Sequence, residues 1–207
     1  MNYEITKRIL SSIIIIAIAF FFIIKGSFFF IFFLSICFFI TIFEWYKMTK
    51  NKNYFLFGLI FLIVSFLSAF LLRNIFLNDF ILVILICISS DVGGFVFGKI
   101  FKGPKLTKIS PNKTYSGMIG SFFLSIISAI FYTNYYGLIY WTDNLLLIAV
   151  ILISFISQLG DLTFSYFKRK SKIKNTGKII PGHGGLLDRI DGMLFAIPFS
   201  YILFKFL

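Results

Sequence analysis

Residues 165–191 read SYFKRKSKIKNTGKIIPGHGGLLDRID and join two strongly apolar segments, 144–167 and 187–206. The first half of this stretch is crowded with basic side chains: Lys168, Arg169, Lys170, Lys172, Lys174 and Lys178. A glycine-rich turn at 181–185 follows, and then come the acids Asp188 and Asp191. Apolar flanks of this length predict that the polar block is a loop between two membrane spans. Cations, backbone N–H groups in a glycine-rich turn and two carboxylates are typical of phosphate chemistry.

The rest of the chain has the composition of a membrane protein. Of its 207 residues, 59% are hydrophobic and only 14% are charged. Apolar runs long enough to cross a bilayer recur along it, which predicts an all-α polytopic integral membrane protein with about seven transmembrane helices. The expected spans are 9–24, 27–43, 54–72, 79–99, 117–136, 144–167 and 187–206. We divide the chain into an N-terminal part, 1–74, with three packing spans, and a catalytic part, 75–207.

The positions of the basic residues predict the orientation of these spans. If the N-terminus is cytoplasmic and the spans alternate, all but three of the 20 Lys and Arg residues lie on the cytoplasmic side. The three on the outer side are Lys25, Arg73 and Lys205. This positive-inside bias favours a cytoplasmic N-terminus and an outer C-terminus. It also accounts for part of the net charge of +12, and we assign another part to phosphate binding, so no nucleic-acid partner is needed to explain the charge.

An acidic residue and a basic loop distinguish residues 79–117. Asp91 lies eight residues before Lys99. At the α-helical rise of about 1.5 Å per residue, this places it about 12 Å below the membrane interface. A carboxylate at that depth costs about 2–3 kcal/mol unless it is paired or hydrated. Gly93 and Gly94 permit close approach of another backbone or of a ligand. Asp91 is therefore a candidate site residue, with a helix-locking pair to a lysine as the alternative. The following loop offers phosphate-binding groups: Ser110, Lys113 and Thr114.

The acids near the ends of the last two spans are expected to meet. Asp161, Ser165 and Lys168 are spaced i, i+4 and i+7, which places them on one face of a helix. Asp188 and Asp191 share a face of the next helix. If these helices pack antiparallel, the carboxylates converge near the cytoplasmic leaflet, where a divalent cation would offset their repulsion. A salt-bridge network with Arg189 and Lys168 is the alternative.

The N-terminal part shows no catalytic constellation. Glu44, Trp45 and Tyr46 close the second span, and we interpret them as an aromatic belt with a snorkelling acid at the interface. Cys37 and Cys87 fall inside apolar spans and are expected to be small buried hydrophobes without a disulfide framework.

Two sets of residues resemble the signatures of phosphatidate cytidylyltransferases (CDP-diacylglycerol synthases). The first signature is Ser-Asp-x-Gly followed by Ser-Pro-x-Lys-Thr-x-Glu-Gly, and it matches Ser90, Asp91, Gly93, Ser110, Pro111, Lys113, Thr114 and Gly117. The second ends in Pro-x-His-Gly-Gly-x-x-Asp-Arg-x-Asp, and it matches Ser165, Lys168, Arg169, Lys174, Pro181, His183, Gly184, Gly185, Asp188, Arg189 and Asp191. Two positions depart from the family: Ser116 replaces a Glu, and Asn175 replaces an Asp.

The resemblance implies an Mg²⁺-dependent nucleotidyltransferase that converts CTP and phosphatidate into CDP-diacylglycerol and pyrophosphate. The implied catalytic residues are Asp161, Lys168, Arg169, His183, Asp188, Arg189 and Asp191. The implied substrate-binding residues are Ser110, Lys113, Thr114, Ser165, Lys174, Gly184 and Gly185. The implied metal ligands are Asp161, Asp188, Asp191 and Asp91, with a second cation left open. The expected partners are CTP, phosphatidate and the lipid bilayer, but no nucleic acid, and a homodimer is left open. The expected location is the inner (plasma) membrane, with the site facing the cytoplasm.

Other functions stay open on the sequence alone. A CTP-dependent polyprenol or dolichol kinase would share the membrane setting and basic loops, although the histidine-containing signature disfavours it. A CDP-alcohol phosphatidyltransferase needs an Asp-Gly-x-x-Ala-Arg motif that is absent. A transporter would carry polar groups near the midplane of several helices, whereas these acids cluster toward one side. A catalytically weakened relative is open because of Asn175 and Ser116.

Overall fold

The computed structural model describes residues 16–50, 52–107, 109–138, 141–177, 179 and 184–206, without the side chain of residue 143. The described residues form a short apolar helix, Ile16–Lys25, and a series of longer helices. The long helices are α2 (Ser27–Thr49), α3 (Phe55–Ile75), α4 (Leu77–Phe101), α5 (Tyr115–Tyr136), α6 (Asp143–Lys170) and α7 (Leu187–Phe206). The only ladder contact among the described residues is an isolated bridge between Lys105 and Thr114. The predicted all-α class is confirmed.

Five helices, α2 to α6, are long and apolar enough to cross a membrane. The chain is therefore a polytopic membrane protein. Large apolar side chains such as Phe28, Phe39 and Phe131 remain exposed on these helices, as expected of surfaces that face lipid. The helix α7 carries Asp188, Arg189, Asp191 and Lys205 and does not reach the hydropathy of the other five. The count of seven spans stays a prediction.

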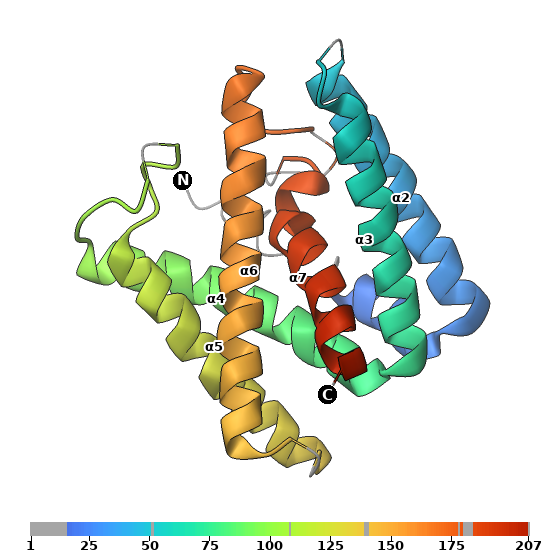
Figure 1. The fold of residues 1–207 in the computed structure, drawn as a ribbon, viewed down its shortest axis with the longest axis vertical. Helices are drawn as coiled ribbons and strands as arrows, with labels where there is room; N and C mark the ends of the chain where they lie inside the picture. The colour runs from blue at the N-terminus through green and yellow to red at the C-terminus, as the bar shows by residue number, and fades with distance from the viewer. Residues whose placement is uncertain are drawn as a thin grey trace.

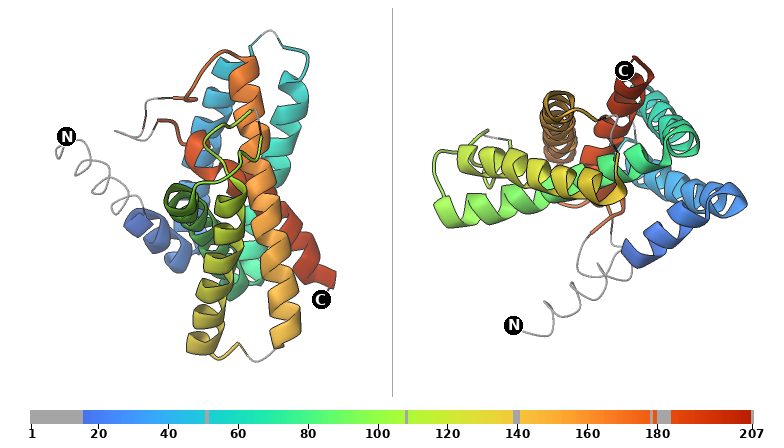
Figure 2. Two further views of the ribbon diagram at one scale, coloured as in Figure 1. Left: turned by 90° about the vertical axis from the view of Figure 1, so that its left-hand side faces the viewer. Right: turned by 90° about the horizontal axis from the view of Figure 1, so that it is seen from below.

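The helices pack around α6 and α7, which run antiparallel beside each other (Figure 1). The antiparallel pair α2 and α3 flanks α7, and α4 crosses behind α6 and α7. Two views agree that α5 lies along α4 on the far side of α6 from α3 (Figure 2).

Glycines bring α4 and α5 into direct backbone contact. A Cβ atom added at Gly93 would lie 2.3 Å from the carbonyl oxygen of Gly120, and one at Gly117 would lie 2.7 Å from the carbonyl oxygen of Gly94. No side chain fits in either place. The expectation that Gly93 and Gly94 admit another backbone is confirmed, and the backbone is that of α5. This contact fixes where the basic loop 102–114 leaves α4 and enters α5.

A buried aromatic cluster supports the end of α6. Trp45 on α2 is only 2% exposed and packs edge-on against Phe164 and Phe167 of α6. Its indole N–H donates to the carbonyl oxygen of Phe55, at 3.0 Å. The prediction that Trp45 belongs to an interfacial belt is wrong, because helix packing encloses the ring. Cys37 and Cys87 are free thiols in or near the core, as expected.

Candidate active site

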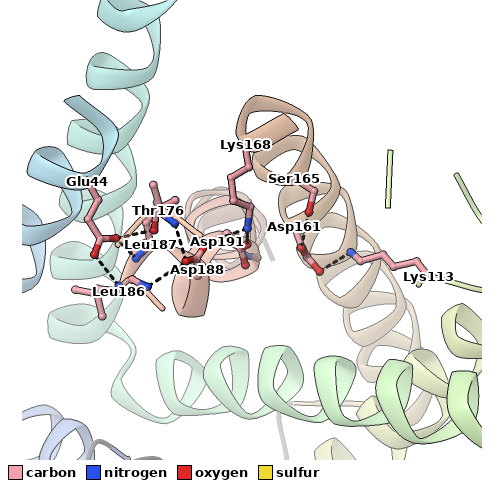
Figure 3. A network of polar contacts seen from close by, with 12 residues as sticks. Glu44, Lys113, Asp161, Ser165, Lys168, Thr176, Leu186, Leu187, Asp188 and Asp191 are labelled. Atoms are coloured by element: carbon pink, nitrogen blue, oxygen red, sulfur yellow. Dashed lines mark hydrogen bonds and ion pairs between the residues drawn. The ribbon is translucent and has the colours of Figure 1, made fainter. Parts of the chain in front are cut away.

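The α6 face predicted from helical spacing is present. Asp161 and Ser165 lie one turn apart, and the Ser165 hydroxyl is 3.4 Å from Oδ1 of Asp161. Lys168 follows on the same side of the helix, and Figure 3 shows all three side chains turned toward the space between α6 and the neighbouring segments. A helix brings residues at this spacing together whatever the rest of the fold does.

Lys168 joins α6 to both acids of α7. Its Nζ lies 3.0 Å from Oδ1 of Asp188 and 3.5 Å from Oδ2 of Asp191. All three side chains are largely buried, so the ion pairs are poorly screened by water. The predicted meeting of the two helices is confirmed. The salt-bridge alternative is also realised in part, with Lys168 as the cation.

Asp188 also fixes the loop between α6 and α7. Its Oδ2 accepts hydrogen bonds from the backbone N–H of Thr176, at 2.9 Å, and of Gly185, at 3.0 Å. Gly184 lies beside it with φ of +92°, a conformation that favours glycine. A Cβ at Gly184 would lie 2.8 Å from Oδ2 of Asp188. The glycine pair therefore serves the internal structure of the loop, and the N–H of Gly185 is already bonded within the protein.

The basic loop 102–114, between α4 and α5, reaches the same site through an ion pair between Lys113 and Asp161. Lys113 stands just before α5, whose first turn is capped by Thr114: the Thr114 hydroxyl oxygen accepts from the N–H of Gly117, at 3.1 Å. The hydroxyl of Ser116 donates to the carbonyl oxygen of Lys102 and lies 2.9 Å from that of Thr114. Ser116 thus ties the two ends of the loop together at the position where the resembling family has Glu.

Three acids from three helices lie near one another. Asp91 on α4 is exposed, and its negative charge interacts with that of Asp161 on α6. Asp191 on α7 is buried and is affected by the charges of both. Hard oxygen ligands of this kind suit Mg²⁺. Within the described ranges, however, no three Asp, Glu, His or Cys side chains are arranged as a metal site. The ammonium groups of Lys113 and Lys168 lie beside the carboxylates instead.

Exposed cations surround these acids. Arg169, Lys174 and Arg189 are all exposed to solvent. An open pocket lies between the basic loop and the last turns of α6 and is lined by Ile109, Pro111, Tyr166, Arg169 and Lys170. The predicted residue Ser110 lies in a turn of that loop, where its N–H donates to the hydroxyl oxygen of Thr107, at 3.2 Å. His183 falls outside the described residues, and its predicted substrate contact stays a prediction.

Glu44 is a site residue that the sequence analysis missed. It is 1% exposed, so its assignment as a snorkelling interfacial acid is wrong. Its carboxylate accepts hydrogen bonds from the backbone N–H groups of Leu186 and Leu187 and from the hydroxyl of Thr176. Figure 3 places it across the loop from Lys168. The available signal was an acid at the end of an apolar helix, whose burial would demand hydrogen-bond donors from elsewhere.

Comparisons with known proteins agree on one family. The sequence model of the cytidylyltransferase family matches residues 54–207. A phosphatidate cytidylyltransferase of Rickettsia prowazekii is 39% identical over 164 residues, which cover 75% of this chain and 72% of the relative. One of Rickettsia bellii is 36% identical over 169 residues, 77% of this chain and 73% of the relative. One of Staphylococcus haemolyticus is 38% identical over 144 residues, 68% of this chain and 54% of the relative.

Proposed function

The chain belongs to the cytidylyltransferase family, and from that premise we propose that it is a phosphatidate cytidylyltransferase. A phosphate oxygen of phosphatidate attacks the α-phosphorus of CTP. The bond between the α-phosphorus and the bridging oxygen breaks, pyrophosphate leaves with the electron pair, and CDP-diacylglycerol stays in the membrane. The nucleophile is already anionic, so the reaction needs no strong base. The observation that carries the proposal is the convergence of two cations on the α6 and α7 acids: Lys113, from the basic loop before α5, and Lys168, near the end of α6.

The main barrier to this reaction is the repulsion between an anionic lipid head and a triphosphate. Fixed cations that neutralise both groups and hold them in line lower that barrier. Arg169, Lys174 and Arg189 are exposed and can bind phosphate oxygens. Lys113 and Lys168 are held by carboxylates, which keep their ammonium groups at the centre of the site. Ser110, Ser165 and Thr114 are assigned hydroxyl contacts to substrate, and His183 is likewise assigned to substrate contact.

We assign Mg²⁺ binding to Asp161 and Asp191, with Asp91 beside them. The mutual repulsion of these carboxylates, offset by two lysines, supports the assignment. Asp188 ranks lowest among the proposed metal ligands, because both of its carboxylate oxygens already accept hydrogen bonds from Lys168 and from the loop backbone. When bound, the cation supplies positive charge that neutralises the phosphates.

We also propose seven spans, a cytoplasmic N-terminus and a location in the inner membrane. The arrangement of the elements supports this orientation. The turn between α2 and α3 and the end of α6 lie at the upper end of Figure 1, and the turn after α3, the end of α5 and the C-terminus lie at the lower end. The upper end carries Lys47, Lys50 and the basic loop that follows α6, as the positive-inside rule requires of a cytoplasmic face.

The proposal is tested with purified protein in detergent micelles that contain phosphatidate. We expect CDP-diacylglycerol and pyrophosphate to form when CTP and Mg²⁺ are added, and product formation to stop when the divalent cation is chelated. The variant Asp79→Asn is the control, and it should keep its activity, because Asp79 is not one of the proposed site residues. Asp79 is buried at the start of α4 and accepts a hydrogen bond from the indole N–H of Trp141, at 2.9 Å, so the variant also changes a buried acid. The proposal would be contradicted if the purified protein formed no CDP-diacylglycerol from CTP and phosphatidate under conditions in which a related phosphatidate cytidylyltransferase is active.

A further inference from the structure

Glu44 lies on α2, in the part of the chain that precedes the family match at 54–207. It nevertheless reaches the loop between α6 and α7. Buried carboxylates are costly unless donors replace the lost water. The donors of Glu44 come from a segment more than 130 positions away in sequence. A residue that served only the packing of α2 against α3 would have no need of them.

Both carboxylate oxygens of Glu44 are engaged by the loop. Oε1 accepts from the N–H of Leu186, at 3.0 Å, and Oε2 accepts from the N–H of Leu187, at 2.8 Å. Oε2 also accepts from the hydroxyl of Thr176, at 2.9 Å. Leu186 and Leu187 stand at the start of α7, where N–H groups have no carbonyl partner within the helix. The positive end of the helix dipole adds to the attraction.

Two glycines leave room for this carboxylate. A Cβ atom at Gly177 would lie 2.4 Å from Oε1 of Glu44, and one at Gly185 would lie 2.4 Å from Oε2. Both distances are far below van der Waals contact, so the loop accommodates Glu44 only with glycine at these positions. Gly185 belongs to the glycine-rich turn of the signature, and the space that a Cβ would need there is taken by the Glu44 carboxylate together with the hydroxyl of Thr176.

Glu44 and Asp188 hold the same two parts of the loop. Glu44 binds the hydroxyl of Thr176, and Asp188 binds its N–H. Glu44 binds the N–H groups of Leu186 and Leu187, and Asp188 binds that of Gly185. Thr176 is thus clamped to the start of α7 by two carboxylates (Figure 3). Asp188 is in turn the partner of Lys168.

We propose that Glu44 is a positioning residue, which closes the loop onto the start of α7 and thereby sets Asp188, Asp191 and Lys168 in place for the reaction. The effect on catalysis rests on the proposed function, whereas the effect on the loop does not. Glu44 itself is buried between α2 and the described ends of the loop.

The experiment compares Glu44→Gln, Glu44→Asp and Thr176→Val with Asp79→Asn and the unchanged protein, all purified in detergent. Glutamine keeps the size of Glu44, but its amide nitrogen cannot accept a hydrogen bond. Valine keeps the shape of Thr176 and removes the hydroxyl donor. The measurements are the rate of tryptic cleavage after Lys172 and Lys174, the thermal midpoint, and kcat and KM for CTP.

For Glu44→Gln we expect at least tenfold faster loop cleavage and at least a tenfold loss of kcat/KM for CTP, with the thermal midpoint shifted by a few degrees only. Thr176→Val should act in the same direction and add less than twofold to Glu44→Gln in the double variant, because both remove one interaction. Glu44→Asp, which keeps the acceptors on a shorter side chain, should recover part of the protection. Asp79→Asn should leave loop cleavage unchanged.

Loop cleavage that is unaltered in Glu44→Gln would overturn the proposal. So would equal loop opening in Asp79→Asn, since the effect would then be general loss of stability. If the unchanged protein makes no CDP-diacylglycerol while Glu44→Gln still opens the loop, the positioning role stands and the proposed function fails.

Discussion

Lys168 and Asp188 join the end of α6 to the start of α7, with Nζ and Oδ1 at 3.0 Å. The same carboxylate holds the loop backbone through Thr176 and Gly185, and the same ammonium group lies 3.5 Å from Asp191. One lysine therefore contacts both α7 acids. Through Asp188, it is also linked to the loop that joins α6 to α7.

Lys168→Met should reduce turnover at least a hundredfold. It removes the cation that offsets Asp188 and Asp191, and leaving a buried partner uncompensated typically costs about 3–5 kcal/mol. Because the site is partly open, we expect the loss in free energy of unfolding to lie in the lower part of that range. Turnover and thermal unfolding in detergent provide the check. Lys99→Met, at an exposed position near the end of α4, is the matched control, and an equal loss there would contradict the special role of Lys168.

Asp161→Asn should abolish turnover while leaving expression and membrane insertion intact. The substitution keeps the size of the side chain but removes the negative charge that pairs with Lys113 and that we assign to Mg²⁺. Losing a metal ligand's charge should cost several kcal/mol in the transition state. The measurement is the initial rate across a series of Mg²⁺ concentrations. Near-normal rates at saturating Mg²⁺ would remove Asp161 from the metal site.

Asn175→Asp should change kcat by less than tenfold and leave the Mg²⁺ dependence unaltered. Asn175 is exposed, and its Cγ lies 3.4 Å from where a Cβ of Gly184 would stand, so it contacts the loop. A charge added at such a surface position is worth about 1 kcal/mol or less. Rates are compared at several Mg²⁺ concentrations. A hundredfold gain with a sharper Mg²⁺ requirement would instead identify a catalytic position and a naturally weakened enzyme.

The basic loops should face the cytoplasm. Single cysteines at Lys105 and Lys174, both exposed, are placed in a chain without Cys37 and Cys87. In intact cells, a membrane-impermeant thiol reagent should leave both unlabelled until the membrane is broken. A cysteine at Tyr135, which is 83% exposed near the end of α5, should be labelled from outside. The reverse pattern would overturn the orientation.

Local patterns were the most reliable guide to this site. The spacing of Asp161, Ser165 and Lys168 predicted one helix face, because helical geometry depends only on neighbouring residues. The meeting of α6 with α7 was predicted on the condition that the two helices pack antiparallel, from the acids near their cytoplasmic ends. The pairing of Lys113 with Asp161 was not predicted, because it depends on how α4 and α5 pack through Gly93 and Gly120.

Glu44 shows why the remainder could not be predicted. An acid at the end of an apolar helix has the same local pattern whether it meets water or a folded loop. Its partners Thr176, Leu186 and Leu187 are distant in sequence, and two of them donate through the backbone, which carries no residue signature. Hydropathy likewise identified the five long spans, whereas α7, with its charged residues, is not among the helices that are apolar enough to cross a membrane.

The most direct test of the central claim follows the phosphorus atoms of CTP. Purified protein is incubated with phosphatidate and CTP labelled either at the α- or at the γ-phosphorus, and the lipid and aqueous products are separated. Cytidylyl transfer predicts that the α-label enters the lipid, as CDP-diacylglycerol, and that the γ-label leaves as pyrophosphate. Entry of the γ-label into a lipid, with release of CDP, would contradict the account and identify a lipid kinase.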